Sequence, residues 1–230
     1  MAPQIVLIRH AQALHNVSNK SPSLSEEGLE QCVTLRQNLL DRFSSVKNAA
    51  IVVSPMRRTL QTACLSLDWL IERGAKIEAN ADWQETSAKP CDTGSPAEAM
   101  AKEFPQVDFS SLDKVWPDKT SPQGQRYAYT KQAILGRGRL GISDLVNRSE
   151  DVIFVVSHSG FMRVGVVGWW FFNSDYRIFT FAEGTDEPLK RLHQSDETIK
   201  GGLGLSWDEE VELGTGLPDP EAEAASASEI

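Results

Sequence analysis

Short apolar runs recur along the chain, and longer segments of mixed polarity separate them. Residues 5–8, 50–53 and 152–156 contain no polar side chain and are rich in β-branched residues. Such runs are typical of strands buried on both faces of a parallel sheet. Shorter segments at 76–79 and 177–181 predict two further strands. The pattern therefore indicates an α/β domain with a mostly parallel sheet.

The segments between these strands have apolar residues at helical spacing. Ser23 and Glu26 have the spacing of a capping box, which predicts that a helix begins here. Its apolar positions mostly fit a period of 3.6 residues: Leu29, Val33, Leu35, Leu39 and Leu40. Further helices are expected from Pro55 to Gly74 and over 97–103, 127–146 and 161–172.

Length and charge indicate one domain followed by a tail. The 230 residues, 40% of them hydrophobic, are enough for one sizeable core. The net charge is −9, but residues 201–230 hold eight acids and no Lys or Arg. We therefore expect a nearly neutral domain over 1–212 and an acidic, disordered tail over 213–230. Without a basic run, nucleic acid is not expected as a partner.

The cysteines and the N-terminus favour a cytoplasmic protein. Cys32, Cys64 and Cys91 are widely spaced, so neither a disulfide framework nor a zinc knuckle is indicated. The first four residues carry no basic region and lead directly into the first strand, unlike a signal peptide. The apolar stretch 161–172 is too short to span a bilayer, and no membrane partner is expected.

Two predicted strands end in a histidine. Arg9 and His10 follow the strand at 5–8, and His158 follows Ser157 at the end of the strand at 152–156. Open α/β sheets place their ligands at the carboxyl ends of the strands. Two such histidines, of only four in the chain, predict a shared pocket. A metal site is the rival use of such a pair.

Three motifs in order resemble the histidine phosphatase superfamily, the phosphoglycerate mutase-like proteins, over about residues 4–182. Leu7-Ile8-Arg9-His10 matches the opening motif, and Ser157-His158-Ser159-Gly160 the late one. The segment 54–62 is similar to the family element Ser-x-Leu-x-Arg-x-x-x-Thr, whose register selects Arg58 rather than Arg57. The resemblance implies a three-layer α/β/α sandwich with a mostly parallel central sheet and a helical and loop insertion at about 86–125. This insertion, here called the lid segment, would set substrate choice.

The resemblance also implies a mechanism. His10 would attack phosphorus to give a phosphohistidine, and Glu85 would act as general acid and then general base. The electropositive field that a phosphoryl group needs would come from Arg9, Arg58 and a protonated His158. Contacts to substrate are expected from Asn16, Ser23 and Ser159.

No metal or other cofactor is expected, because Arg9 and Arg58 in one pocket would repel a divalent cation. The expected partner is a small phosphorylated substrate; Trp83, Phe109 and Trp116 could face an apolar leaving group. The segment after Glu85 lacks the Glu-Arg-His-Tyr-Gly continuation of the cofactor-dependent mutases, which favours a phosphatase. A mutase-type phosphotransferase, a family member with non-phosphoryl chemistry and a phospho-ligand-binding module remain alternatives. The pattern G-x-G-x-x-G at 136–141 is not expected to bind a dinucleotide, because no strand precedes it.

Overall fold

A single sheet forms the centre of the molecule in the computed structural model, which describes residues 2–14, 22–182, 187–190 and 192–220. Among these residues the sheet has six strands in the order β3-β2-β4-β1-β5-β6. Strands β3, β2, β4 and β1 are parallel, whereas β5 and β6 are antiparallel to their neighbours. The strands are β1 (Gln4–Arg9), β2 (Ala49–Val53), β3 (Lys76–Ala79), β4 (Val152–Ser157), β5 (Tyr176–Phe181) and β6 (Leu192–Gln194). The predicted strands are present, and β6 is an addition.

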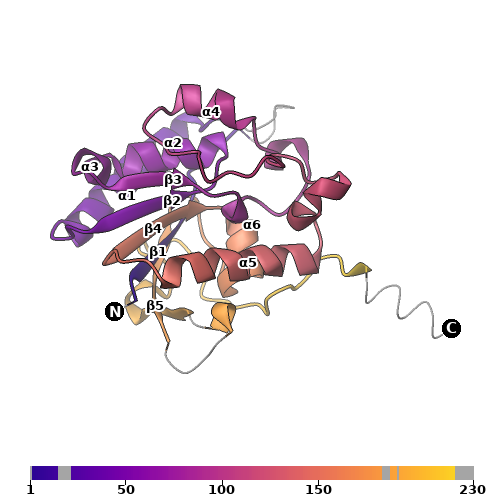
Figure 1. The fold of residues 1–230 in the computed structure, drawn as a ribbon. Coiled ribbons are helices and arrows are strands. Elements are labelled where there is room, and N and C mark those ends of the chain that lie inside the picture. Colours follow the sequence, from indigo (N-terminus) through magenta and orange to yellow (C-terminus); the bar gives the residue numbers. More distant parts are fainter. Residues whose placement is uncertain (1, 15–21, 183–186, 191, 221–230) are drawn as a thin grey trace.

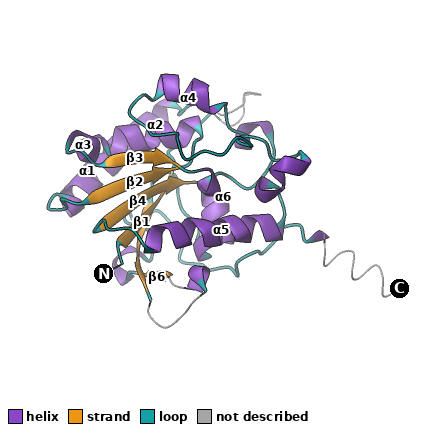
Figure 2. Cartoon of the chain, viewed as in Figure 1, coloured by secondary structure: helices purple, strands orange, loops and turns teal. Residues whose placement is uncertain are grey.

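Helices cover both faces of the sheet (Figures 1 and 2). On one face lie α1 (Glu26–Phe43), α2 (Arg57–Ser66), α3 (Asp68–Glu72) and α4 (Ala97–Glu103). The other face is covered by α5 (Lys131–Val146) and α6 (Ser159–Met162), which runs on into a π-helical turn, η4 (Arg163–Val167). Short 3-10 turns are η1 (Ala81–Trp83), η2 (Pro90–Asp92), η3 (Pro122–Tyr127), η5 (Pro188–Lys190) and η6 (Asp196–Thr198). The three-layer α/β/α sandwich is confirmed.

The pairing of β1 with β4 brings the two histidines to one edge of the sheet. The parallel register places Arg9 opposite Ser157. His10 and His158 are therefore the next residues of two adjacent strands, and their rings lie with centroids 5.1 Å apart.

Several helix bounds differ from the prediction, and the helix expected from Pro55 to Gly74 is divided at Leu67 into α2 and α3. The cap of α1 is Ser25, whose side chain accepts a hydrogen bond from the Gly28 amide, so the capping box at Ser23 was wrong. Helix α5 begins only at Lys131, where the Thr130 hydroxyl caps it. The helix predicted to reach residue 172 ends at Gly168, which has a φ of 79° that favours glycine.

The lid segment divides into two parts with different positions. Helix α4 packs on the core beside β3, and Asp108 exchanges backbone hydrogen bonds with Ile77 and Ala79. This part extends the edge of the fold rather than covering the site. Residues 86–95 and 116–125 lie instead toward the carboxyl ends of the strands, at the side of Figure 1 where α6 begins.

The start of the predicted tail packs on the domain. The Gly214 amide donates to the Val164 carbonyl, and the Lys131 amide donates to the Pro218 carbonyl. Residues 213–220 are thus part of the fold, contrary to the expectation of disorder. The rest of the tail, 221–230, lies outside the described residues. No helix in the described part of the chain combines the length and apolarity needed to cross a bilayer.

Candidate active site

His10 is held as a neutral imidazole with a defined tautomer. Its Nδ1 lies 2.7 Å from the Ala11 carbonyl oxygen, which can only accept, so Nδ1 carries the proton. Its Nε2 accepts a hydrogen bond of 3.1 Å from Nε of Arg58. The ring is 2% exposed. The Nε2 lone pair therefore points toward the cationic side of the site.

Arg58 lies at the centre of the site, where it contacts both histidines. The first turn of α2 carries it, and its side chain is buried. Besides His10, its guanidinium donates to Nδ1 of His158 at 3.1 Å and to the Cys91 carbonyl at 2.7 Å. It also pairs with Asp92 at 3.3 Å. Burial lowers the pKa of Arg58, and the nearby carboxylates of Glu85 and Asp92 act against this shift.

The motif at 54–62, which includes Arg58, also supplies two hydroxyls that hold the ends of β1 and β4 in place. Ser54 Oγ lies 2.8 Å from Nε2 of His158. Thr62 Oγ1 accepts from the Ala11 amide and donates to the Arg58 carbonyl. The motif thus ties β2 and α2 to both histidines, which explains the Ser and Thr that accompany its arginine.

His158 is neutral in this structure, which corrects the expectation that it is protonated. Arg58 can only donate, so Nδ1 of His158 must accept, and the Nε2 proton then points to Ser54. The ring is fully buried, and burial, followed by the charge of Arg58, lowers the pKa of His158 well below its usual value. The positive charge beside the two histidines therefore comes from Arg9 and Arg58 rather than from His158.

Arg9 is placed at the same edge by the end of β1. Its Nη1 donates to the Phe171 carbonyl at 2.8 Å, and its guanidinium lies 5.8 Å from the centre of the Trp170 ring. Burial lowers the pKa of Arg9 to about 10, while Glu85 acts in the opposite direction. Arg9 is still a cation at neutral pH.

Glu85 faces the late histidine motif at Gly160, where the backbone leaves room for its carboxylate. Its Oε1 accepts from the Thr86 amide at 2.8 Å. A Cβ on Gly160 would lie 2.6 Å from this Oε1, closer than real Cβ contacts allow. Gly160 therefore leaves room for the carboxylate beside the start of α6.

Three residues that the sequence did not single out for the site position the Glu85 loop. Arg137, buried in α5, donates to the carbonyls of Asp82, Gln84 and Glu85. Lys119 holds the residues that follow, and Asp92 pairs with Arg58. Arg137 belongs to the rejected glycine-rich pattern and lies inside a helix. The only sequence feature that could have indicated a role for Arg137 is its position as a basic residue on an otherwise apolar face of the helix.

The remaining residues predicted to contact substrate do not all lie together at the site. Asn16 lies outside the described residues. Ser159 Oγ accepts from the Phe171 amide at 3.1 Å, and Ser23 accepts from the Leu14 amide through its carbonyl. Roles for Ser23 and Ser159 in substrate binding stay predictions. Trp83 and Trp116 are buried, which argues against the suggestion that they could face an apolar leaving group. Phe109 packs partly against the core.

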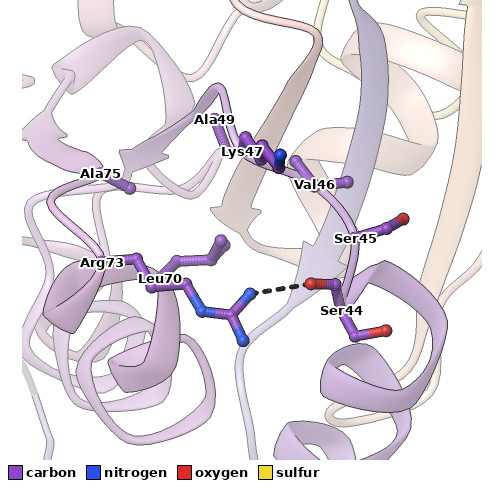
Figure 3. Close-up of a pocket in the computed structure, with 8 residues that line it drawn as sticks. All are labelled: Ser44, Ser45, Val46, Lys47, Ala49, Leu70, Arg73 and Ala75. Atoms are coloured by element: carbon purple, nitrogen blue, oxygen red, sulfur yellow. Dashed lines mark hydrogen bonds between the residues drawn. The ribbon is translucent and has the colours of Figure 1, made fainter.

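A partly open pocket of about 410 Å³ lies elsewhere, at the amino ends of the strands (Figure 3). It is lined by residues next to the amino ends of β2 and β3, and Arg73 donates to the Ser44 carbonyl across it. It contains neither histidine and is separate from the chemistry. Within the described part of the chain, no three His, Cys, Asp or Glu side chains gather closely enough to hold a metal ion.

Comparison with known proteins identifies the family. Residues 5–178 match the histidine phosphatase superfamily (branch 1), and the chain belongs to this family. A Schizosaccharomyces pombe protein described as a probable phosphatase is 27% identical over 169 residues, which cover 70% of this chain and 76% of that protein. An Arabidopsis thaliana phosphoglycerate mutase-like protein is 28% identical over 201 residues, covering 69% of this chain and 72% of its own length.

The fold also matches that of a solved structure. A mycobacterial glucosyl-3-phosphoglycerate phosphatase superposes with a TM-score of 0.52 at 16% identity. The match covers 84% of this chain and 96% of that one. At this identity the likeness concerns the fold alone.

Proposed function

We propose that this protein is a phosphatase that hydrolyses a small phosphate monoester through a phosphohistidine on His10, without a metal ion. The observation that carries the proposal is the pairing of a neutral His10 with Arg58 at one edge of the sheet. A nucleophile with a free-base nitrogen beside a buried guanidinium suits attack on an anionic phosphoryl group. Membership of the family and the name of the S. pombe relative support the same reaction.

The first step forms a bond between His10 Nε2 and phosphorus and breaks the bond from phosphorus to the ester oxygen. The proton stays on Nδ1 and keeps its hydrogen bond to the Ala11 carbonyl, which stabilises the positive charge that develops on the ring. Arg9 and Arg58 would bind the equatorial oxygens, where the transition state spreads its charge. His158 contributes hydrogen bonding in its neutral form.

Glu85 serves as the proton carrier in this proposal. In its protonated form it gives a proton to the leaving alkoxide, and as a carboxylate it then removes a proton from the water that attacks the phosphohistidine. Inorganic phosphate leaves and His10 returns to its starting state. A phosphotransferase of the mutase type is the alternative, supported by the name of the A. thaliana relative.

The test is hydrolysis of p-nitrophenyl phosphate in the presence of a chelator. We expect turnover by the wild type and a loss of at least about 10³-fold in His10→Ala, because the nucleophile is absent. His193→Ala is the matched control, since that histidine is exposed in β6. Turnover that disappears with chelator, or that survives in His10→Ala, contradicts the proposal.

A further inference from the structure

Lys119 is a buried lysine that the proposed reaction does not use. It lies in the lid segment, and the residue is only 4% exposed. Its Nζ donates three hydrogen bonds to backbone carbonyls, at 2.7 Å to Glu85, 2.8 Å to Ser87 and 2.7 Å to Asp92. One ammonium therefore joins both ends and the middle of the loop 85–92.

Both ends of this loop reach catalytic groups. At its start is Glu85, whose carboxylate lies against Gly160. Near its end, the Cys91 carbonyl and the Asp92 carboxylate bind the guanidinium of Arg58. The Ser87 hydroxyl donates to the Asp92 carboxylate at 2.6 Å and closes the loop on itself. The separation of the proton carrier from the phosphate-binding arginine thus depends on the shape that Lys119 gives to the loop.

We propose that Lys119 is a positioning residue, whose ammonium sets the placement of Glu85 and Arg58 for phosphoryl transfer. The inference rests on the proposed function for its catalytic consequence, and on the geometry of the loop for its structural one. Small displacements at a reacting centre reduce rates strongly. We therefore expect loss of the Lys119 ammonium to lower kcat more than it lowers the stability of the fold.

The environment of Lys119 makes this positioning sensitive to pH. The charged groups around it are the carboxylates of Glu85 and Asp92 and the guanidinium groups of Arg58 and Arg137. Burial, followed by the charge of Arg137, lowers the pKa of Lys119 to about 7, against the effect of the two carboxylates. The ammonium has three N–H donors for three carbonyls, and the neutral amine has two. As the pH rises through this pKa, the loop loses a donor and the activity falls.

The first measurement compares kcat and its pH profile in Lys119→Met, Lys119→Arg and the wild type. Methionine keeps the length of the side chain without donors, and we expect kcat to fall at least about tenfold, with a smaller change in KM. Arginine stays charged at high pH, so partial activity and an alkaline limb moved to higher pH are expected. Lys114→Met is the matched control, because Lys114 is an exposed lysine of the same segment.

The second measurement does not depend on catalysis. Cys91 belongs to the loop, whereas Cys64 lies in α2 and serves as an internal reference. We expect Lys119→Met to speed alkylation of Cys91 relative to Cys64 at a fixed pH, as read by peptide mass spectrometry, and Lys114→Met to leave the ratio unchanged.

The outcomes separate the two proposals. Unchanged kcat and an unchanged Cys91 ratio in folded Lys119→Met overturn the role of Lys119. If that variant does not fold, the profiles of Lys119→Arg and the wild type decide. A wild-type kcat that stays flat from about pH 6 to about pH 9 then overturns it. A wild type that hydrolyses no phosphate ester overturns the proposed function, and the alkylation ratio still tests the loop.

Discussion

The site is built from two regions that are held in place by different means. The sheet-edge region consists of Arg9, His10 and His158, whose positions follow from the parallel register of β1 and β4. The loop region, residues 85–92, has no strand pairing. It is held by buried cations, Arg137 and Lys119, which together bind five carbonyls of residues 82–92.

The difference concerns how each region responds to change. Many cooperative backbone hydrogen bonds fix the sheet edge, so one side-chain substitution there removes a function without moving the frame. In the loop region a single cation binds the carbonyls of several residues at once. Replacing that cation is therefore expected to displace residues that are themselves unchanged. Arg58 is the residue at which the two regions meet, because it contacts both histidines and both Cys91 and Asp92.

The largest expected effect comes from separating the regions at this junction. Arg58→Ala removes the guanidinium that holds both, and we expect kcat/KM for p-nitrophenyl phosphate to fall by about 10²–10³-fold. Arg57→Ala is the control, because the neighbouring arginine pairs with Glu103 away from the histidines. Equal losses in the two variants would contradict the central position of Arg58.

A smaller effect is expected where the loop touches the sheet edge. Gly160→Ala places a Cβ 2.6 Å from the Glu85 carboxylate, which must move, and we expect kcat to fall about tenfold or more. The folded state is not expected to lose as much, because alanine favours a helix by about 1 kcal/mol over glycine.

The matched control for this variant is Gly136→Ala in α5. A Cβ at Gly136 would meet no described atom within 4 Å, so both activity and fold should persist. Thermal unfolding and steady-state kinetics on the two variants separate a displaced carboxylate from a damaged helix. A fully active Gly160→Ala would mean that the position of Glu85 is not critical.

The smallest expected effect, a change in phosphate inhibition, comes from replacing the Asp92 carboxylate that pairs with Arg58. Asp92→Asn keeps the shape but removes a negative charge that competes with phosphate, and we expect inorganic phosphate to inhibit at about fivefold lower concentration. Asp144→Asn, on the exposed face of α5, should leave the inhibition constant unchanged. Weaker inhibition in Asp92→Asn would indicate that the carboxylate orients Arg58 rather than competing with its ligand.

The sequence predicted the sheet-edge region well for a physical reason. Buried strands produce unbroken apolar runs, and polar residues at their ends must lie at the edge of the sheet. The local pattern therefore predicted that His10 and His158 share one edge, where their rings lie. The motif register selected Arg58, which contacts both histidines, rather than Arg57, which pairs with Glu103. The position of each of these residues follows from the strand or motif that lies directly beside it in the sequence.

The loop region could not be predicted because its contacts are distant in sequence and involve backbone atoms. Lys119 binds carbonyls 27 to 34 residues away, and any residue type can offer a carbonyl. Nor does composition distinguish Lys119 from the exposed lysines of the same segment. The charge of His158 was wrong for a related reason, because it depends on the donor that faces its Nδ1.

One buried carboxylate ties the segment 203–206 to the sheet. Asp175, directly before β5, accepts hydrogen bonds from the amides of Tyr176, Leu203 and Leu205 and from the Ser206 hydroxyl. A polypeptide cut after residue 195 would leave this charge in the interior with one amide, at the very strand that pairs with β1. The set is complete only in a chain that reaches Ser206, so the acidic segment that begins at residue 201 supplies part of the support for β5.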